Sequence, residues 1–266
     1  MTWHDGLYCR VKWDGVYSDW FRISAGVRQG GVLSPDLYSL YVDDLICILE
    51  SIGVGCYIKG MFAAALFYAD DMAVLSPSIK GLHKLLEACS NYCTEWDIKL
   101  NASKSKNMVL RAKSNPSHCL QLNGAIVPWE SSCKYLGVVL KSGPVFNCCV
   151  KETIAKFYRS LNSIIRIEGR SDDMVMLRLL EAHCLPILAY AIEIIAVSDR
   201  DDKRQLRVAY NAIYRKMFDF SIRESVTLLQ LSLGRSTWET YVQERKTKFL
   251  NRLKTCPPNS LLRAFA

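Results

Sequence analysis

Two adjacent aspartates stand between two apolar segments of the chain. Residues 62–69 read FAAALFYA, Asp70 and Asp71 follow, and residues 72–76 read MAVLS. A carboxylate buried without a partner carries a large free-energy cost. The chain is therefore expected to reverse direction here, with two strands packed in a sheet and both charges at the tip of a tight hairpin.

Adjacent carboxylates on a rigid turn suit a hard divalent cation. Mg²⁺ accepts one or two protein carboxylates and fills its remaining positions with water and substrate phosphates. Such a pair can take part in two-metal phosphoryl transfer, in which the ions activate the attacking oxygen and stabilise the leaving one. From the residues alone, an ordinary solvated turn remains the alternative reading of Asp70 and Asp71.

Three further Asp–Asp pairs occur, at 43–44, 172–173 and 201–202. The first falls inside an expected amphipathic helix, where we expect it to face solvent. The other two stand at expected helix starts, where carboxylates stabilise the helix dipole. Structural roles suffice for these three pairs.

The apolar pattern changes its period near residue 143. Mixed elements are expected before that point: a hairpin over 9–23 that turns at Asp14–Gly15, a helix over 35–50 capped by Ser34 with Pro35 in its first turn, a helix over 78–95, and short strands near 107–111, 119–122, 125–129 and 134–140. After it only helical spacing is found, in helices near 148–168, 172–196 (bent at Pro186), 199–218 and 235–254.

The positive charge is concentrated in the C-terminal part. Residues 1–140 contain 13 basic and 13 acidic side chains and residues 141–266 contain 21 and 13, so the second part carries the whole net charge of +8. This asymmetry is typical of a chain in which one part faces a polyanion. A solvated helical surface rich in Lys and Arg is the alternative.

The cysteines do not indicate a disulfide framework. There are 11, an odd number, and no C-x-x-C motif or secretory signal accompanies them. We expect reduced cysteines in an intracellular protein, nuclear or cytoplasmic, that is neither secreted nor bound to a membrane. Cys89 and Cys93, with His83 before them, are expected to pack in a core, and a zinc site is the alternative.

Several stretches follow one another in a characteristic order. They are GVRQGGVLSPDLYSLYVDDL (26–45), LFYADDMAVLS (66–76), WDIKLNASKSKNMVL (96–110), KYLGVVL (134–140) and LPILAYAIEII (185–195). Together they resemble reverse transcriptases, most closely those of non-LTR (LINE-type) retrotransposons, over about residues 8–250. The resemblance implies an α+β fold: a partial polymerase palm with an antiparallel sheet over 1–143, an all-α thumb-like region over 144–254, and a loose tail over 255–266.

The resemblance also implies roles for single residues. Asp70 and Asp71 would hold the catalytic Mg²⁺, of which the complete enzyme uses two ions. Lys104 would stabilise the leaving pyrophosphate or donate a proton, with a solvated lysine as the alternative. Gln29 would lie along the template base or the incoming nucleotide. Arg28 would pair with a phosphate or form a salt bridge within the palm.

Further residues would contact the substrates, which are an RNA template, a DNA primer and nucleotides. Gly30 would let the backbone approach a base pair, and the small Ala69 would leave room for the primer end. Tyr68 would pack the hairpin onto the palm, and Asn101 matches the Asn of the family's next motif. The primer-grip strand would include Tyr135, Leu136 and Gly137.

One part of the family pattern is not found. A polymerase of this kind uses a third carboxylate from an earlier palm strand, and only 25 residues precede Gly26. Neither Asp5 nor Asp14 stands where the family has that residue. We therefore expect a fragment without the first catalytic Asp and the fingers. Two alternatives remain: an inactive relic that at most binds nucleic acid, and a group II intron-type maturase.

Overall fold

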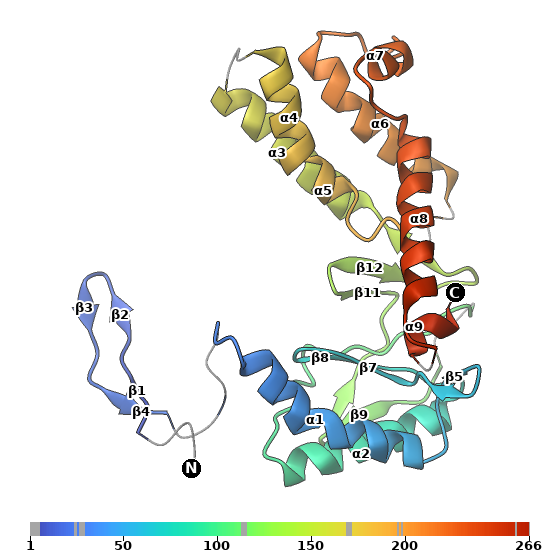
Figure 1. Cartoon of the computed structure of the whole chain (residues 1–266). Coiled ribbons are helices and arrows are strands. Elements are labelled where there is room, and N and C mark those ends of the chain that lie inside the picture. The colour runs from blue at the N-terminus through green and yellow to red at the C-terminus, as the bar shows by residue number, and fades with distance from the viewer. Residues whose placement is uncertain are drawn as a thin grey trace. The chain divides into compact units, whose positions relative to one another are not determined.

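The fold combines small antiparallel sheets with helices, which confirms the expected α+β class (Figure 1). The computed structural model describes residues 6–23, 26, 30–112, 116–168, 172–195, 197, 199–258 and 260–265. The chain forms two compact units. The first comprises Met1–Tyr57 and Phe62–Asp97, and the second comprises Ile58–Met61 and Ile98–Ala266.

The first unit begins with the predicted hairpin. Its outer strands are β1 (Tyr8–Cys9) and β4 (Phe21–Arg22), and its inner strands are β2 (Lys12–Trp13) and β3 (Val16–Tyr17). The turn residues Asp14 and Gly15 both have positive φ, +46° and +80°. A two-residue turn with positive φ at both positions matches the right-handed twist of the flanking strands, which explains the Asp-Gly pair.

Two helices pack side by side in this unit. Helix α1 (Ser34–Ser51) buries Val42, Leu45 and Leu49 against α2 (Ile79–Glu95), and the Tyr92 hydroxyl donates a hydrogen bond of 2.9 Å to the carbonyl of Tyr41. The Ser78 hydroxyl caps α2 by accepting from the Gly81 N–H.

The predicted cap of α1 was wrong by one residue. Pro35 lies in the first turn as expected, but the N-cap is Leu33, without a side-chain cap hydrogen bond. The reason is that the Leu33 carbonyl already accepts the N–H of Leu37 at 2.9 Å, so Ser34 falls inside the helix.

Two further strands of the first unit form the hairpin predicted over 62–76. Strand β7 (Ala65–Tyr68) pairs with β8 (Asp71–Val74), and α2 packs on β8, where the Cys89 thiol contacts the Met72 sulfur at 4.0 Å. Cys89 and Cys93 are both buried, as expected of core residues. Burial raises the pKa of the Cys89 thiol to about 12, so this thiol stays protonated at neutral pH. A short pairing of β5 (Tyr57–Ile58) with β6 (Met61–Phe62) precedes this hairpin along the chain.

The second unit starts with two small sheets. One is the hairpin of β9 (Leu120–Leu122) and β10 (Ala125–Val127), and the other has the order β11 (Ser132–Tyr135), β12 (Val138–Lys141), β13 (Asn147–Cys149). The strand expected near 107–111 is reduced to two isolated bridges, Asn107 with Trp129 and Leu110 with Gly143.

The prediction of a single strand over 134–140 was also wrong. The chain reverses at Leu136 and Gly137, which have φ of +44° and +80°, so this segment is the hairpin of β11 and β12. A leucine at positive φ is uncommon because its Cβ crowds the backbone, and Leu136 therefore did not indicate a turn in the sequence.

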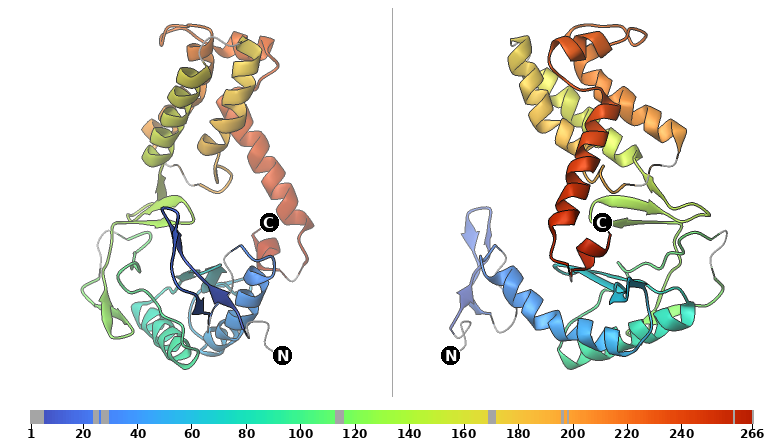
Figure 2. Two further views of the ribbon diagram at one scale, coloured as in Figure 1. Left: turned by 90° about the vertical axis from the view of Figure 1, so that its left-hand side faces the viewer. Right: turned by 45° about the vertical axis from the view of Figure 1, so that its right-hand side comes forward.

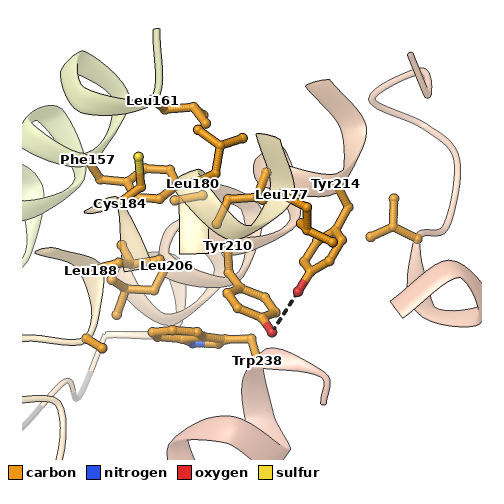
Figure 3. Packing of buried hydrophobic residues seen from close by; sticks show 14 of the residues in the cluster. Phe157, Leu161, Leu177, Leu180, Cys184, Leu188, Leu206, Tyr210, Tyr214 and Trp238 are labelled. Atoms are coloured by element: carbon orange, nitrogen blue, oxygen red, sulfur yellow. Dashed lines mark hydrogen bonds between the residues drawn. The ribbon is translucent and has the colours of Figure 1, made fainter. Parts of the chain in front are cut away.

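Helices make up the rest of this unit, and side chains from all of them except the last form one core. The helices are α3 (Lys151–Glu168), α4 (Asp173–His183), α5 (Leu185–Leu188), α6 (Arg200–Met217), α7 (Thr227–Ser232), α8 (Trp238–Thr255) and α9 (Leu261–Ala264). Figure 3 shows their buried side chains, among them Phe157, Leu161, Leu177, Leu180, Cys184, Leu188, Leu206, Tyr210, Tyr214 and Trp238. Figure 2 shows α3, α4 and α6 together from two further directions.

Three details of the helical part differ from expectation. The helix expected over 172–196 ends at His183, because Pro186 has no N–H to donate to a preceding carbonyl. Helix α7 had not been predicted. The segment 255–266 contains α9, whose Ala264 is buried.

Candidate active site

The two central carboxylates lie at the tip of a tight hairpin. Tyr68, the last residue of β7, pairs with Asp71, the first residue of β8, and Ala69 and Asp70 form the turn between them. Ala69 has a φ of +50°, which turns the chain within two residues. Both Asp70 and Asp71 are exposed, so their predicted placement is confirmed.

The tip is electrostatically uncompensated within the described part of the chain. Neither Asp70 nor Asp71 accepts a hydrogen bond or an ion pair from another described residue there. Two adjacent oxygen-donor side chains without competing partners fit a hard cation such as Mg²⁺. No group of three or more metal-ligating His, Cys, Asp or Glu side chains is found in the described ranges.

The negative charge at the tip acts on a side chain that was not among the predicted site residues. Tyr38 of α1 has its phenol pKa raised, first by burial and then by the negative charge of Asp70. The two residues lie on a helix and on a turn more than 30 residues later in the chain, so no local sequence pattern predicts this interaction.

Tyr68 does not have the packing role expected of it. Its side chain is 66% exposed. Successive strand residues point to opposite faces, and here Phe67 takes the inner position and Tyr68 the outer one. The phenol ring beside Asp70 and Asp71 is therefore open to solvent.

Asn101 organises the turn that carries Lys104. Its side-chain oxygen accepts the Lys104 N–H at 3.1 Å and the Ser103 hydroxyl at 2.7 Å, and its carbonyl accepts the Ser105 N–H at 3.0 Å. An Asn side chain that bonds the backbone in this way fixes a turn. The Lys104 side chain itself is exposed, and it belongs to the second compact unit.

The glycine-rich loop is described only in part. Arg28 and Gln29 lie outside the described residues. Gly26 and Gly30 have φ of +95° and +80°, in the left-handed region that favours glycine. Among the described residues, no atom would lie within 4 Å of a Cβ at Gly30, so they leave the backbone there open to a close approach.

The expected primer-grip residues form a turn held by a distant tyrosine. Tyr135 ends β11, and Leu136 and Gly137 make the reversal into β12. The Tyr190 hydroxyl donates a hydrogen bond of 2.8 Å to the Leu136 carbonyl, and its ring would lie 3.1 Å from a Cβ placed on Gly137. Tyr190 comes from the segment that follows α5 within the same unit.

A carboxylate pair at the tip of a β-hairpin that packs on a helix is the arrangement that the resemblance to reverse transcriptases implies for this segment. Residues 2–140 match the family described as reverse transcriptase (RNA-dependent DNA polymerase), and the chain therefore belongs to this family. Its relatives come from mobile elements, which confirms the resemblance to reverse transcriptases of non-LTR retrotransposons.

Curated relatives cover nearly the whole chain. It is 27% identical over 287 residues to the probable RNA-directed DNA polymerase from transposon BS of Drosophila melanogaster, which covers 95% of this chain and 31% of that protein. It is 25% identical over 294 residues to the RNA-directed DNA polymerase from mobile element jockey of Drosophila funebris, covering 98% and 32%. The chain thus spans about a third of the length of these relatives. None of the described helices is both long and apolar enough to span a bilayer.

Proposed function

We propose that this chain forms the carboxylate-bearing palm segment and thumb of an RNA-directed DNA polymerase that elongates a DNA primer on an RNA template. The observation that carries the proposal is the exposed Asp70–Asp71 pair at the tip of the β7–β8 hairpin. Family membership supports the reaction class. The proposed substrates are therefore nucleoside triphosphates, an RNA template and a DNA primer.

The hairpin tip would bind Mg²⁺ through Asp70 and Asp71. When bound, the metal stabilises charge on the attacking and leaving oxygens of nucleotidyl transfer. Ala69 has no side chain beyond Cβ, so a primer end can approach the turn. The exposed ring of Tyr68 offers a stacking surface beside the carboxylates, which replaces its expected packing role.

Other residues would hold the substrates. Lys104 would approach the leaving pyrophosphate, and the turn ordered by Asn101 fixes the backbone from which its side chain extends. Arg28 and Gln29 would contact phosphate and base. The turn at Leu136 and Gly137 would support the primer strand.

Metal binding can be tested on the 266-residue polypeptide directly. Mn²⁺, a paramagnetic substitute for Mg²⁺, should broaden the NMR signals of residues 68–72 in the wild type. The double variant Asp70→Asn/Asp71→Asn should lose this effect. Asp43→Asn/Asp44→Asn is a matched control, because that pair is exposed on helix α1. Equal broadening in the wild type and the tip variant would contradict the metal site.

Primer extension tests the reaction itself. The polypeptide alone should extend a primer on RNA little or not at all, since two ions about 4 Å apart need a further bridging carboxylate. A chimera in which residues 6–141 replace the matching segment of the transposon BS polymerase should extend the primer, and Asp70→Asn should abolish this. A chimera that binds Mn²⁺ at the tip yet does not polymerise would overturn the proposed function.

A further inference from the structure

The N-terminal hairpin has two chemically different faces. Directly paired residues share a face of the sheet, which places Lys12 with Tyr17 and Tyr8 with Arg22. The second face holds the pairs Trp13 with Val16 and Cys9 with Phe21. One face is therefore aromatic and basic, and the other is apolar.

A β-bulge adds one more ring to the basic face. Ser18 donates its N–H to the Val11 carbonyl and Cys9 pairs with Phe21, so Asp19 and Trp20 together stand opposite Arg10. A bulge of this kind re-aims a side chain. Here the Arg10 guanidinium lies 4.8 Å from the centre of the Trp20 ring and 3.9 Å from that of Tyr17.

Two cations on this face, Arg10 and Lys12, keep their charge available. Lys12 also lies over the Tyr17 ring, at 5.3 Å. Neither Arg10 nor Lys12 forms an ion pair within the described ranges, although the hairpin contains Asp14 and Asp19. Stacking on rings orients the cations without neutralising them.

The rings are also accessible. Trp20 is 61% exposed and Tyr17 47% exposed. Exposed rings interleaved with uncompensated cations match a ligand that alternates flat aromatic groups with negative charges. A single-stranded nucleic acid has this chemistry, because its bases stack on aromatic side chains and its phosphates attract Arg and Lys.

We propose that the face formed by Arg10, Lys12, Tyr17 and Trp20 binds single-stranded nucleic acid by base stacking. The face contacts bases and phosphates and does not contact the sugar specifically. RNA and DNA strands of equivalent sequence should therefore bind with similar affinity. The proposal concerns binding alone and does not depend on the polymerase reaction.

The test uses the full 266-residue chain and a labelled oligouridylate of about ten nucleotides, a typical site size for such surfaces. Fluorescence anisotropy should show binding at least about fivefold weaker for Trp20→Ala, the lower range for loss of one stacked base. Trp13→Ala is the matched control, since it removes the same ring from the opposite face of the same hairpin. An equal loss in both variants, or none in Trp20→Ala, would overturn the proposal.

Two further arms separate stacking from simple charge attraction. An abasic strand of equal length should compete poorly, although it carries the same phosphates, and equal competition would contradict stacking. Arg10→Gln should lower the steepness of the log–log salt dependence by about 0.7, the value for one phosphate on a single strand.

Photocrosslinking locates the contact. Trypsin cuts after Lys12 and Arg22, so a single peptide contains all three aromatic residues in question. Fragmentation of this peptide should place the nucleotide adduct on Tyr17 or Trp20. An adduct confined to Trp13 would contradict the assigned face.

Discussion

The hydroxyl of Tyr190 donates a hydrogen bond of 2.8 Å to the carbonyl of Leu136, which precedes it by 54 residues. The bond joins the β11–β12 turn to the segment that follows α5. Both partners belong to the second compact unit. The turn proposed to support the primer is therefore braced by the helical part of the chain.

Gly137→Ala should destabilise the second unit more than Gly124→Ala. Both glycines have a φ near +80°, at +80° and +76°, and follow a residue at positive φ in a hairpin turn. The backbone strain should be similar, about 1 kcal/mol for each. Only Gly137 has Tyr190 against the added Cβ, at 3.1 Å, which should add up to about 1 kcal/mol.

Denaturant midpoints of the two variants give this difference. As a control, both glycine substitutions are also measured in the Tyr190→Ala background, where the excess of Gly137→Ala over Gly124→Ala should shrink. Identical losses for Gly137→Ala and Gly124→Ala would show that Tyr190 does not crowd the turn.

Glu181→Gln should destabilise the helical part by about 2 kcal/mol, because it leaves a partly buried guanidinium without its counter-charge. Arg235 binds the Glu181 carboxylate through two hydrogen bonds, of 2.6 and 2.8 Å. The hydrogen bond to Glu181 raises the pKa of Arg235, so the guanidinium remains charged. The exposed pair Lys134–Glu152, at 3.4 Å, is the control: Glu152→Gln should cost about 0.5 kcal/mol or less. Thermal unfolding of both variants checks the ranking, and equal shifts would contradict it.

Asp70→Asn should lower the pKa of Tyr38 without restoring its ordinary value. Burial is the larger cause of the raised pKa and survives the substitution, whereas the nearby negative charge disappears. Asp71→Asn should have a smaller effect, since Asp70 is the tip carboxylate that acts on Tyr38. Titration of the tyrosine ¹³Cζ signals by NMR, assigned with Tyr38→Phe, measures both shifts. A larger shift in Asp71→Asn would contradict the assignment, because it would mean that Asp71 and not Asp70 acts on Tyr38.

Duplex binding by the C-terminal helices should depend steeply on salt. Lys203 and Arg204 are exposed and make no side-chain ion pair within the described part, whereas Arg207 pairs with Glu239 at 3.6 Å. Replacing Lys203 and Arg204 by Gln should lower the steepness of the log–log slope by about 2. Lys80→Gln/Lys84→Gln on α2 is the matched control and should leave it unchanged. Filter binding at several salt concentrations measures the slope for the wild type and for both double variants. Equal slopes in these three proteins would contradict phosphate contacts at this helix.

Local chemistry explains which elements could be predicted from the sequence. Asp14–Gly15 and Asp70–Asp71 were predicted as turns because the first has the residues that such a turn favours and the second places charge between apolar strands. Asp172 was predicted at a helix start, and its carboxylate indeed accepts the N–H groups of Met174 and Val175. In each case the determining residues are neighbours in the chain.

The features that escaped prediction depend on distant contacts. Leu136 has no intrinsic preference for positive φ, and its turn is supported by Tyr190. The Arg235–Glu181 pair likewise joins residues 54 positions apart. Such pairs follow from helix packing, which one sequence does not specify by any local pattern.

The aromatic packing in the helical core also has an optical consequence. Trp238 is the one tryptophan of the described residues that is buried, and the ring centres of Tyr210 and Tyr241 lie 5.4 and 5.9 Å from its own. An indole shielded from water emits at shorter wavelength than an exposed one, and neighbouring phenols transfer excitation to it. The blue edge of the chain's fluorescence therefore reports on the helical part without an added label, while the exposed Trp13 and Trp20 contribute at the red edge.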